Sequence, residues 1–120
     1  MRRDAFGRRR GFRVLVAEAD RRIVGYASFV PGYNTDLAAR ELWMLDLFVV
    51  ARWRSRGVGL ALVAAVAREA LRRRLPCLEW GVRGDNTLAR RFYRRLGATI
   101  GDLRIAALVG PALTAVAGRR

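Results

Sequence analysis

Residues 41–74 constrain the fold more than any other part of this chain. An apolar run, ELWMLDLFVV at 41–50, leads through a charged segment with two glycines at 52–59 into a helical pattern at 59–74. Apolar residues on nearly every position predict a strand that is buried on both faces. One apolar stripe runs along the helical pattern and consists of Leu62, Val63, Val66, Ala70 and Leu71. This segment therefore predicts a strand, a loop and a helix that pack together in an α/β layer.

Two β-rich runs precede this unit. Residues 13–20 and 22–29 are joined at the polar pair Asp20-Arg21, which predicts a hairpin. The sequence Pro31-Gly32-Tyr33-Asn34 is typical of a turn, and we expect it to lead into the strand at 41–50. Residues 1–12 are rich in Arg and Gly without periodicity, so we expect a flexible basic arm followed by one domain at 13–120.

Further elements are expected after the helix at 59–74. They are a strand at 77–82, a helix from the cap Asn86 to Gly97, a strand at 103–109 and a short helix after Pro111. The apolar positions of the helix that follows Asn86 are Leu88, Phe92 and Leu96. The order β-β-β-α-β-α-β predicts an α/β (α+β) fold with a mixed central sheet and helices packed on it.

The composition excludes several kinds of chemistry. The chain has no His and no Lys, and Cys77 is its only cysteine. A zinc site with the usual Cys and His ligands is therefore excluded, and we expect no metal. Nucleophile pairs that use His and Schiff bases that use Lys are excluded as well. The remaining reactive groups are carboxylates, hydroxyls, phenols, backbone amides and guanidinium groups.

The net charge of +14 favours an anionic partner, because all 24 basic residues are Arg and only 10 residues are acidic. A coding bias towards Arg explains the same charge equally well. Nucleic-acid binding is the least favoured alternative, since the sequence carries no recognised nucleic-acid motif. No apolar run approaches the roughly 20 residues that span a bilayer, so we expect no membrane segment. One free cysteine and a basic, charged N-terminus indicate a cytoplasmic protein.

The segment Arg54-Ser55-Arg56-Gly57-Val58-Gly59 is the most specific functional pattern. Glycines between a strand and a helix let the backbone approach a ligand, and the first amides of a helix attract anions. Arg52 and its neighbours add forked donors that suit phosphate groups. The alternative interpretation, an ordinary basic strand-to-helix turn, is equally consistent with the spacing.

Four other polar residues are candidates. Asn86 and Tyr93 are seven residues apart, which places a cap and a phenol on one helix face. Taken alone, the pair is more simply interpreted as a plain N-cap and a tyrosine whose ring packs against the core. Asp46 is a carboxylate within an apolar strand, so it either pairs with an Arg or has a function. Glu79, expected on the neighbouring strand, more simply points to the surface or pairs with an Arg.

Taken together, these motifs resemble the GNAT-type N-acetyltransferase superfamily. The family pattern [RQ]-x-x-G-x-[GA] corresponds to Arg54, Gly57 and Gly59. A second pattern corresponds to Asn86, Phe92-Tyr93 and Gly97-Ala98. The run Leu-Asp-Leu-Phe-Val at 45–49 is most similar to the branch with diamine and spermidine acetyltransferases. The resemblance covers about residues 13–110.

The resemblance implies acetyl transfer from acetyl-CoA to a small-molecule or peptide amine by direct attack. It implies that Tyr93 protonates the leaving thiolate and that Asp46 or Glu79 accepts the amine proton through a water. The cofactor contacts that it implies fall into three groups. They are the pantetheine contacts Leu47, Phe48 and Val49, the pyrophosphate contacts Arg54, Ser55, Arg56, Gly57, Val58, Gly59 and Leu60, and the more distant contacts Asn86 and Ala89.

The sequence departs from the family pattern at two places. Leu45 stands where the related branch has a Glu before the aspartate, which leaves the general base undecided. The chain begins near the family's second strand, so we expect an open acceptor side, a shortened version or completion by a partner subunit. A non-catalytic domain that binds CoA or a partner protein is the main alternative function. Unpaired sheet edges favour a homodimer.

Overall fold

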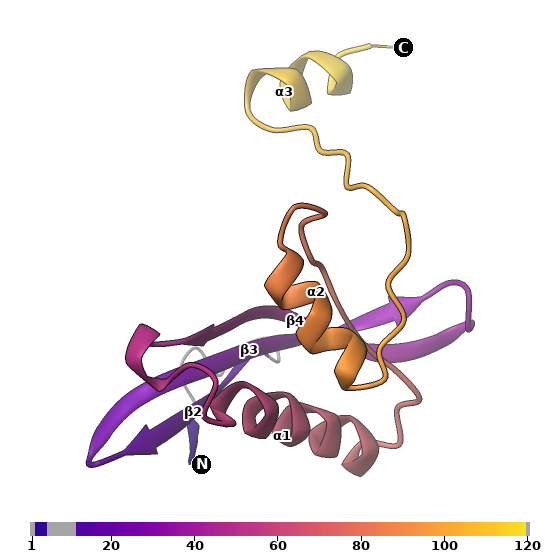
Figure 1. Cartoon of the computed structure of the whole chain (residues 1–120). Helices are drawn as coiled ribbons and strands as arrows, with labels where there is room; N and C mark the ends of the chain where they lie inside the picture. Colours follow the sequence, from indigo (N-terminus) through magenta and orange to yellow (C-terminus); the bar gives the residue numbers. More distant parts are fainter. Residues whose placement is uncertain (1, 5–11, 120) are drawn as a thin grey trace. The chain divides into compact units, whose positions relative to one another are not determined.

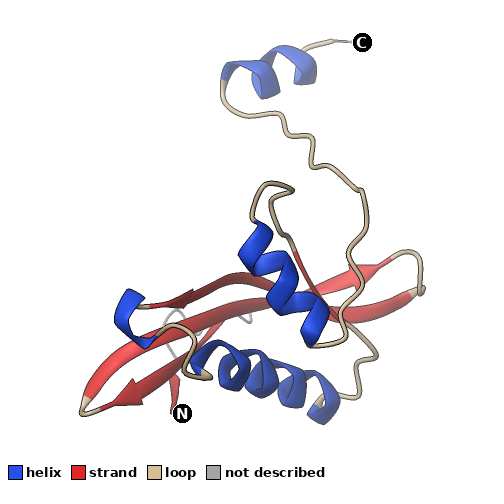
Figure 2. Cartoon of the chain, in the orientation of Figure 1, coloured by secondary structure: helices blue, strands red, loops and turns tan. Residues whose placement is uncertain are grey.

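The computed structural model describes residues 2–4 and 12–119, and the chain divides into two compact units, residues 1–86 and 87–120. The first unit contains an antiparallel series of four strands, one long helix and a fifth strand (Figures 1 and 2). The elements are β1 (Arg2–Asp4), β2 (Arg13–Ala19), β3 (Arg22–Asn34), β4 (Ala39–Val49), α1 (Val58–Arg72) and β5 (Leu78–Trp80). A 3-10 turn, η2 (Ala51–Trp53), connects β4 towards α1.

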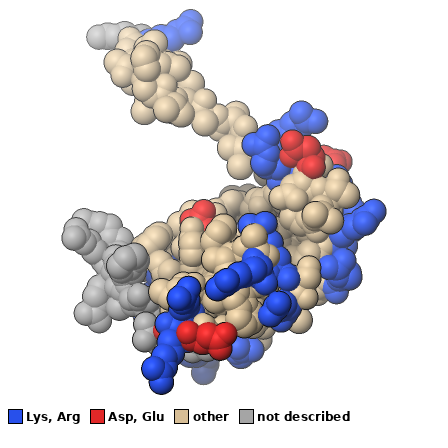
Figure 3. Space-filling view, turned by 60° about the vertical axis from the view of Figure 1, so that its left-hand side comes forward, with Lys and Arg blue, Asp and Glu red and all other residues tan. Residues whose placement is uncertain are grey.

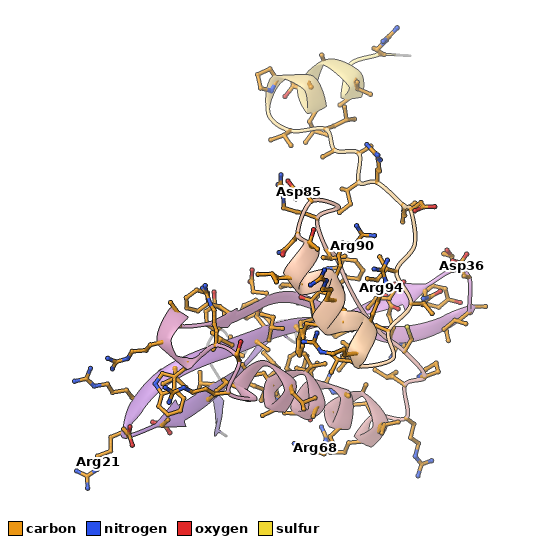
Figure 4. All side chains as sticks on the ribbon, viewed as in Figure 1. Arg21, Asp36, Arg68, Asp85, Arg90 and Arg94 are labelled. Carbon is orange, nitrogen blue, oxygen red and sulfur yellow. The ribbon has the colours of Figure 1, made fainter. Side chains whose placement is uncertain are left out.

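The strands form one sheet in the order β1-β2-β3-β4-β5. The first four strands pair antiparallel, and β5 pairs parallel to β4. The sheet is therefore mixed, as expected from the sequence. Figure 4 places Arg21 at the β2–β3 hairpin and Asp36 at the β3–β4 hairpin, at opposite ends of the sheet.

Helix α1 packs along one face of the sheet, against β2, β3 and β4. Leu62, Val63, Val66 and Ala70 are buried as the periodicity predicts, whereas Leu71 is exposed and its assignment to the stripe is wrong. Arg68 lies on the side of α1 away from the sheet (Figure 4). The helix approaches β3 closely at Gly25, where a Cβ atom would lie 2.7 Å from the Phe48 carbonyl oxygen and 3.2 Å from Val58. This glycine is needed for space.

Strand β4 contains a bulge at Leu45. Met44 is opposite Phe29 and Asp46 is opposite Ser28, so Leu45 is an extra residue without a partner in β3. The bulge exchanges the two faces of the strand. Leu42 and Met44 are buried before it, whereas Asp46 and Phe48 are exposed after it. The expectation that residues 41–50 are buried on both faces is wrong. A bulge changes which residues of a strand face the core, and an unbroken apolar run gives no sign of where a bulge lies.

The predicted turn at residues 31–34 is wrong, because β3 continues through Asn34 and the turn lies at 35–38. Pro31 is opposite Leu42, whose N–H donates to the Cys77 carbonyl on the other side of β4. The nitrogen of Pro31 therefore points away from β4. It faces the side of β3 where pairing with β2 has ended at Phe29, so the missing N–H interrupts no ladder among the described strands.

The amino-terminal expectation is partly wrong. Residues 2–4 form β1, which pairs with Val14–Val16, although the composition predicted an arm without secondary structure. The edge of β2 offers unpaired backbone groups to any segment, and pairing of that kind leaves no sequence signature. The rest of the arm, residues 1 and 5–11, lies outside the described residues. Helix α1 agrees with the predicted 59–74 within two residues.

The second unit contains α2 (Thr87–Arg95) and α3 (Pro111–Ala117). Helix α2 ends as predicted at Gly97, whose φ is 94°, with Gly97 N–H donating to Arg94 and Ala98 N–H to Tyr93. Its buried residue is Tyr93, whereas Leu88 is exposed, contrary to the predicted stripe. The predicted strand at 103–109 is wrong. These residues are irregular and exposed, because apolar residues form a strand only where a second strand pairs with them.

Candidate functional site

Strand β4 has an open edge beyond the end of β5. The parallel pairing joins Leu42 to Leu78, Trp43 to Glu79 and Met44 to Trp80, and it stops there. Strand β4 itself continues through the bulge to Val49. Within the part of the chain that the structure describes, no strand pairs with residues 45–49 on this side. The edge can therefore pair with an extended ligand as a further strand would.

Backbone alternation decides which residues of β4 face this edge. Val50 N–H donates to the Val24 carbonyl at 2.9 Å, so this pair is hydrogen-bonded and Tyr26–Phe48 is the next such pair. The N–H and C=O groups of Leu47 and Val49 consequently point away from β3, towards the open edge. Leu47 and Val49, for which cofactor contacts are predicted, thus present their backbone groups at this edge. The backbone of Phe48 is turned towards β3, so the predicted backbone contact of this residue with a ligand has no free group at this edge.

A turn with two left-handed residues connects this edge to α1. Ser55 has φ 62° and Gly57 has φ 85°, and Gly57 is the N-cap residue of the helix. A Cβ atom on Gly57 would meet nothing within 4 Å, so this position requires glycine for its backbone conformation and leaves open space beside it. No side chain caps α1, and its first turn contains no acidic residue. The amides of Val58, Gly59 and Leu60 are therefore available to an anion.

Arginines surround this turn and differ in their contacts. Arg54 Nε donates to the Val49 carbonyl at 2.9 Å, and its guanidinium carbon lies 6.0 Å from the centre of the Phe48 ring. The guanidinium carbon of Arg56 lies 5.0 Å from the centre of the Trp53 ring. Arg52, Arg54 and Arg56 are exposed. Figure 3 shows arginine side chains spread over the face in view with few acidic side chains between them, which favours anionic ligands.

Asp46 follows the bulge and is exposed, so the expectation of a buried carboxylate is wrong. Its Oδ2 accepts a hydrogen bond from Ser28 Oγ at 2.9 Å across the β3–β4 pair. Among the described residues it forms no ion pair with an Arg. Asp46 shares its face of the sheet with Phe48, whose ring packs 5.9 Å from that of Tyr26.

Glu79 belongs to a carboxylate pair at the paired part of β4. A hydrogen bond with the buried Glu41 raises the pKa of Glu79, and burial and the charges of Glu41 and Asp36 raise it further. Asn34 Nδ2 donates to Glu41 Oε1 at 3.2 Å and lies 3.7 Å from Cys77 Sγ. Burial, with the hydrogen bond to Glu41 next in size, raises the pKa of Cys77 to about 11. The thiol is therefore neutral at pH 7.

The predicted residues of the other motif lie near and within α2. Asn86 directly precedes the helix, and its backbone N–H donates to the Arg83 carbonyl at 3.0 Å. Ala89 is half-buried and Tyr93 is buried. The rings of Phe92 and Tyr93 pack with their centres 5.5 Å apart. Asn86 is the last residue of the first unit, whereas Ala89 and Tyr93 belong to the second.

Sequence reasoning missed Ser28, Glu41 and the contact of Arg54 with Val49. Ser28 could not have been found by counting, because its place opposite Asp46 depends on the bulge at Leu45 and on the position of the β3–β4 turn. Glu41 begins the apolar run and carried no signal of a carboxylate partner 38 positions later. Within the described ranges, no group of three or more His, Cys, Asp or Glu residues is arranged to hold a metal ion. None of the helices in those ranges has both the length and the apolar character to cross a membrane.

The model of the acetyltransferase (GNAT) family matches residues 2–98. The L-ornithine N5-acetyltransferase NATA1 of Arabidopsis thaliana is 33% identical over 95 residues, which cover 78% of this chain and 42% of that protein. The thialysine N-epsilon-acetyltransferase of Mus musculus is 31% identical over 111 residues, and the match covers 82% of this chain and 62% of that protein. The chain thus spans about half the length of these relatives.

Solved structures share the fold. An integron cassette protein from the mobile metagenome of V. cholerae superposes with a TM-score of 0.81 and 25% identity, covering 91% of this chain and 68% of that one. The aminoglycoside N-acetyltransferase AAC(6')-Iy in complex with CoA superposes with a TM-score of 0.71 and 21% identity, and the match covers 80% of this chain and 74% of that one. These matches agree with the mixed sheet and its helices.

The Glu41–Glu79 pair predicts a pH-dependent stability. The pKa of Glu79 is raised in the folded state. The protonated Glu79 therefore contributes to the free energy of unfolding below the ordinary Glu pKa of about 4.3, and this contribution is lost as the pH rises through the raised pKa. Glu79→Gln keeps a donor for Glu41 and removes the repulsion. We expect the variant to gain stability relative to the wild type between about pH 4 and 7, by under about 1 kcal/mol since Glu79 is exposed.

Urea unfolding at several pH values measures this difference. Asp20→Asn is the control, because it removes one carboxylate from the exposed β2–β3 turn and Asn also tolerates the positive φ of 52° there. A Glu79→Gln difference that is constant from pH 4 to 7 would show that the two carboxyls do not share a proton.

Proposed function

The chain belongs to the acetyltransferase (GNAT) family, and on this premise we propose that it transfers an acetyl group from acetyl-CoA to an amine. The observation that carries the proposal is the junction of an open strand edge with an uncapped helix start. Leu47 and Val49 present backbone groups at that edge, and the amides of α1 follow after one turn. The first feature suits an extended amide-containing arm, and the second suits a pyrophosphate.

The residues of this junction fit such a substrate in size and charge. Gly57 leaves open space in front of the helix amides. Arg52 and Arg56 add positive charge without an acidic residue in the first turn of α1. We propose that Ser55 to Leu60 bind the pyrophosphate, that Leu47 and Val49 bind the pantetheine arm, and that Asn86 and Ala89 contribute beyond it.

The proposed reaction is a direct transfer without a covalent enzyme intermediate. The amine nitrogen attacks the acetyl carbonyl carbon, the carbon–sulfur bond breaks and the thiolate leaves. Tyr93 donates its phenolic proton to the thiolate, and a carboxylate accepts the proton that the amine loses. Asp46 is the proposed base, because it lies on the strand segment that borders the open edge. A chain without His or Lys suits this scheme, since no enzyme nucleophile is needed.

The proposed acceptor is a small molecule or a peptide with a primary amine. Two relatives are named for acetylation of ornithine and thialysine, which both carry an amine on a side chain. Asp46 supplies one negative charge for such an amine. Leu45 supplies none, so we propose an acceptor with a single amine near the carboxylate rather than a polyamine.

Gly57→Asp tests the pyrophosphate site. A carboxylate at this position repels a pyrophosphate at the helix start, so we expect acetyl-CoA affinity to fall at least about tenfold. Gly57→Asn is the matched control, because Asn has the same shape and also tolerates positive φ. Calorimetric titration with acetyl-CoA measures both variants. Equal affinities for the Asp and Asn variants would refute the assignment of the turn to the pyrophosphate.

Tyr93→Phe tests the general acid. We expect turnover to fall by about a hundredfold or more, since general acids contribute factors of roughly 10² to 10⁴. Acetyl-CoA affinity should change less than about twofold, because the ring is retained. Tyr33→Phe removes an exposed phenol elsewhere and is the control. Full turnover of Tyr93→Phe at every pH would assign the proton to a water or to another group.

Asp46→Asn tests the base. Asn still accepts the hydrogen bond from Ser28, so we expect the thermal midpoint to change little while turnover falls about a hundredfold. Ser28→Ala removes the hydrogen bond and keeps the carboxylate, so its turnover should fall less. Retained turnover in Asp46→Asn combined with lost turnover in Glu79→Gln would move the base to Glu79.

A further inference from the structure

Arg54 is held at the end of the open edge by two contacts. Its Nε donates to the carbonyl oxygen of Val49 at 2.9 Å, five residues earlier in the chain. Its guanidinium group lies over the ring of Phe48 on the same strand. The side chain therefore turns back to β4 and does not extend away from the turn into solvent.

The carbonyl that Arg54 occupies is one that faces the open edge. The alternation of the β3–β4 ladder directs Leu47 and Val49 to that edge and Phe48 to β3. Arg54 takes one of the two acceptor positions of the Val49 carbonyl, so the edge groups without any contact from the turn are the N–H and C=O of Leu47 and the N–H of Val49. Arg54 thus ends the row of acceptors one residue before the turn begins.

We propose that Arg54 is a positioning residue whose Nε–H, rather than its charge, closes the edge of β4 at Val49 and fixes the start of the turn. A ligand paired with Leu47 then leaves the strand at this point and meets the amides of α1. This inference rests on the proposed function for the identity of the ligand. The part of the inference that concerns the fixed conformation of the turn rests only on the hydrogen bond from Arg54 to Val49.

The neighbouring Arg56 provides the contrast. It lies over the Trp53 ring, and within the described chain it makes no hydrogen bond to a backbone group. Its contribution to an anion site is therefore its charge. At position 54 the effect of the charge can be separated from the effect of the hydrogen-bond donor. Gln has no charge but carries an N–H on the fourth atom from Cα, as Arg does with Nε. Met has the same length and no donor.

The experiment compares Arg54→Gln, Arg54→Met and Arg54→Lys with Arg56→Gln and Arg56→Met. CoA affinity is measured by calorimetry, and amide hydrogen exchange of residues 50–60 is measured without ligand. We expect Arg54→Met to weaken CoA binding roughly fivefold or more and to speed exchange in the turn, since one hydrogen bond is lost. Arg54→Gln should restore most of both properties. At position 56, Gln and Met should have equal effects.

Equal losses in Arg54→Gln and Arg54→Met with affinity retained in Arg54→Lys would overturn the inference, because charge would then be the property that matters. Unchanged exchange and affinity in Arg54→Met would overturn it as well. Wild-type protein that binds no CoA would overturn the proposed function. The exchange comparison made without ligand distinguishes that failure from a failure of the Arg54 assignment.

Discussion

The parallel hydrogen bonding between β4 and β5 ends at Met44 and Trp80, and the candidate site depends on that early end. Five residues of β4 continue beyond it, and the bulge at Leu45 lies immediately after the last pair. The bulge places the side chains of Asp46 and Phe48 on the exposed face of the sheet, while the pairing of β4 with β3 continues. A strand that is paired on one side and open on the other therefore leads directly into the helix start.

Arginine serves two separate purposes around this helix start. Arg54 acts through a hydrogen bond to the strand, whereas Arg56 contributes charge beside the Trp53 ring. This separation also accounts for the family pattern, which accepts Arg or Gln at the first position. The two side chains differ in charge but share an N–H group at the same distance along the chain. The proposed role of the donor at Arg54 agrees with a pattern that accepts both side chains.

The sequence predicted the strand–turn–helix unit at 41–74 because its apolar periodicity and its glycines are local signals. The end of α2 at Gly97 was predictable for the same reason. Features set by pairing between distant segments were not predictable, and they include the bulge at Leu45, the strand β1 and the continuation of β3 past Pro31. Residues 103–109 have strand-like composition, yet a strand needs a partner that composition does not provide.

The two carboxylates considered as bases differ most in their surroundings. The raised pKa of Glu79 brings that carboxyl closer to the neutral range in which general bases work best. Its partner Glu41 is buried, however, and both lie at the part of β4 that β5 covers by pairing. Asp46 is held by a neutral hydroxyl on the segment beyond that pairing. Reach to the substrate precedes pKa in deciding a base, so we propose Asp46 for that role and a structural role between β4 and β5 for the Glu41–Glu79 pair.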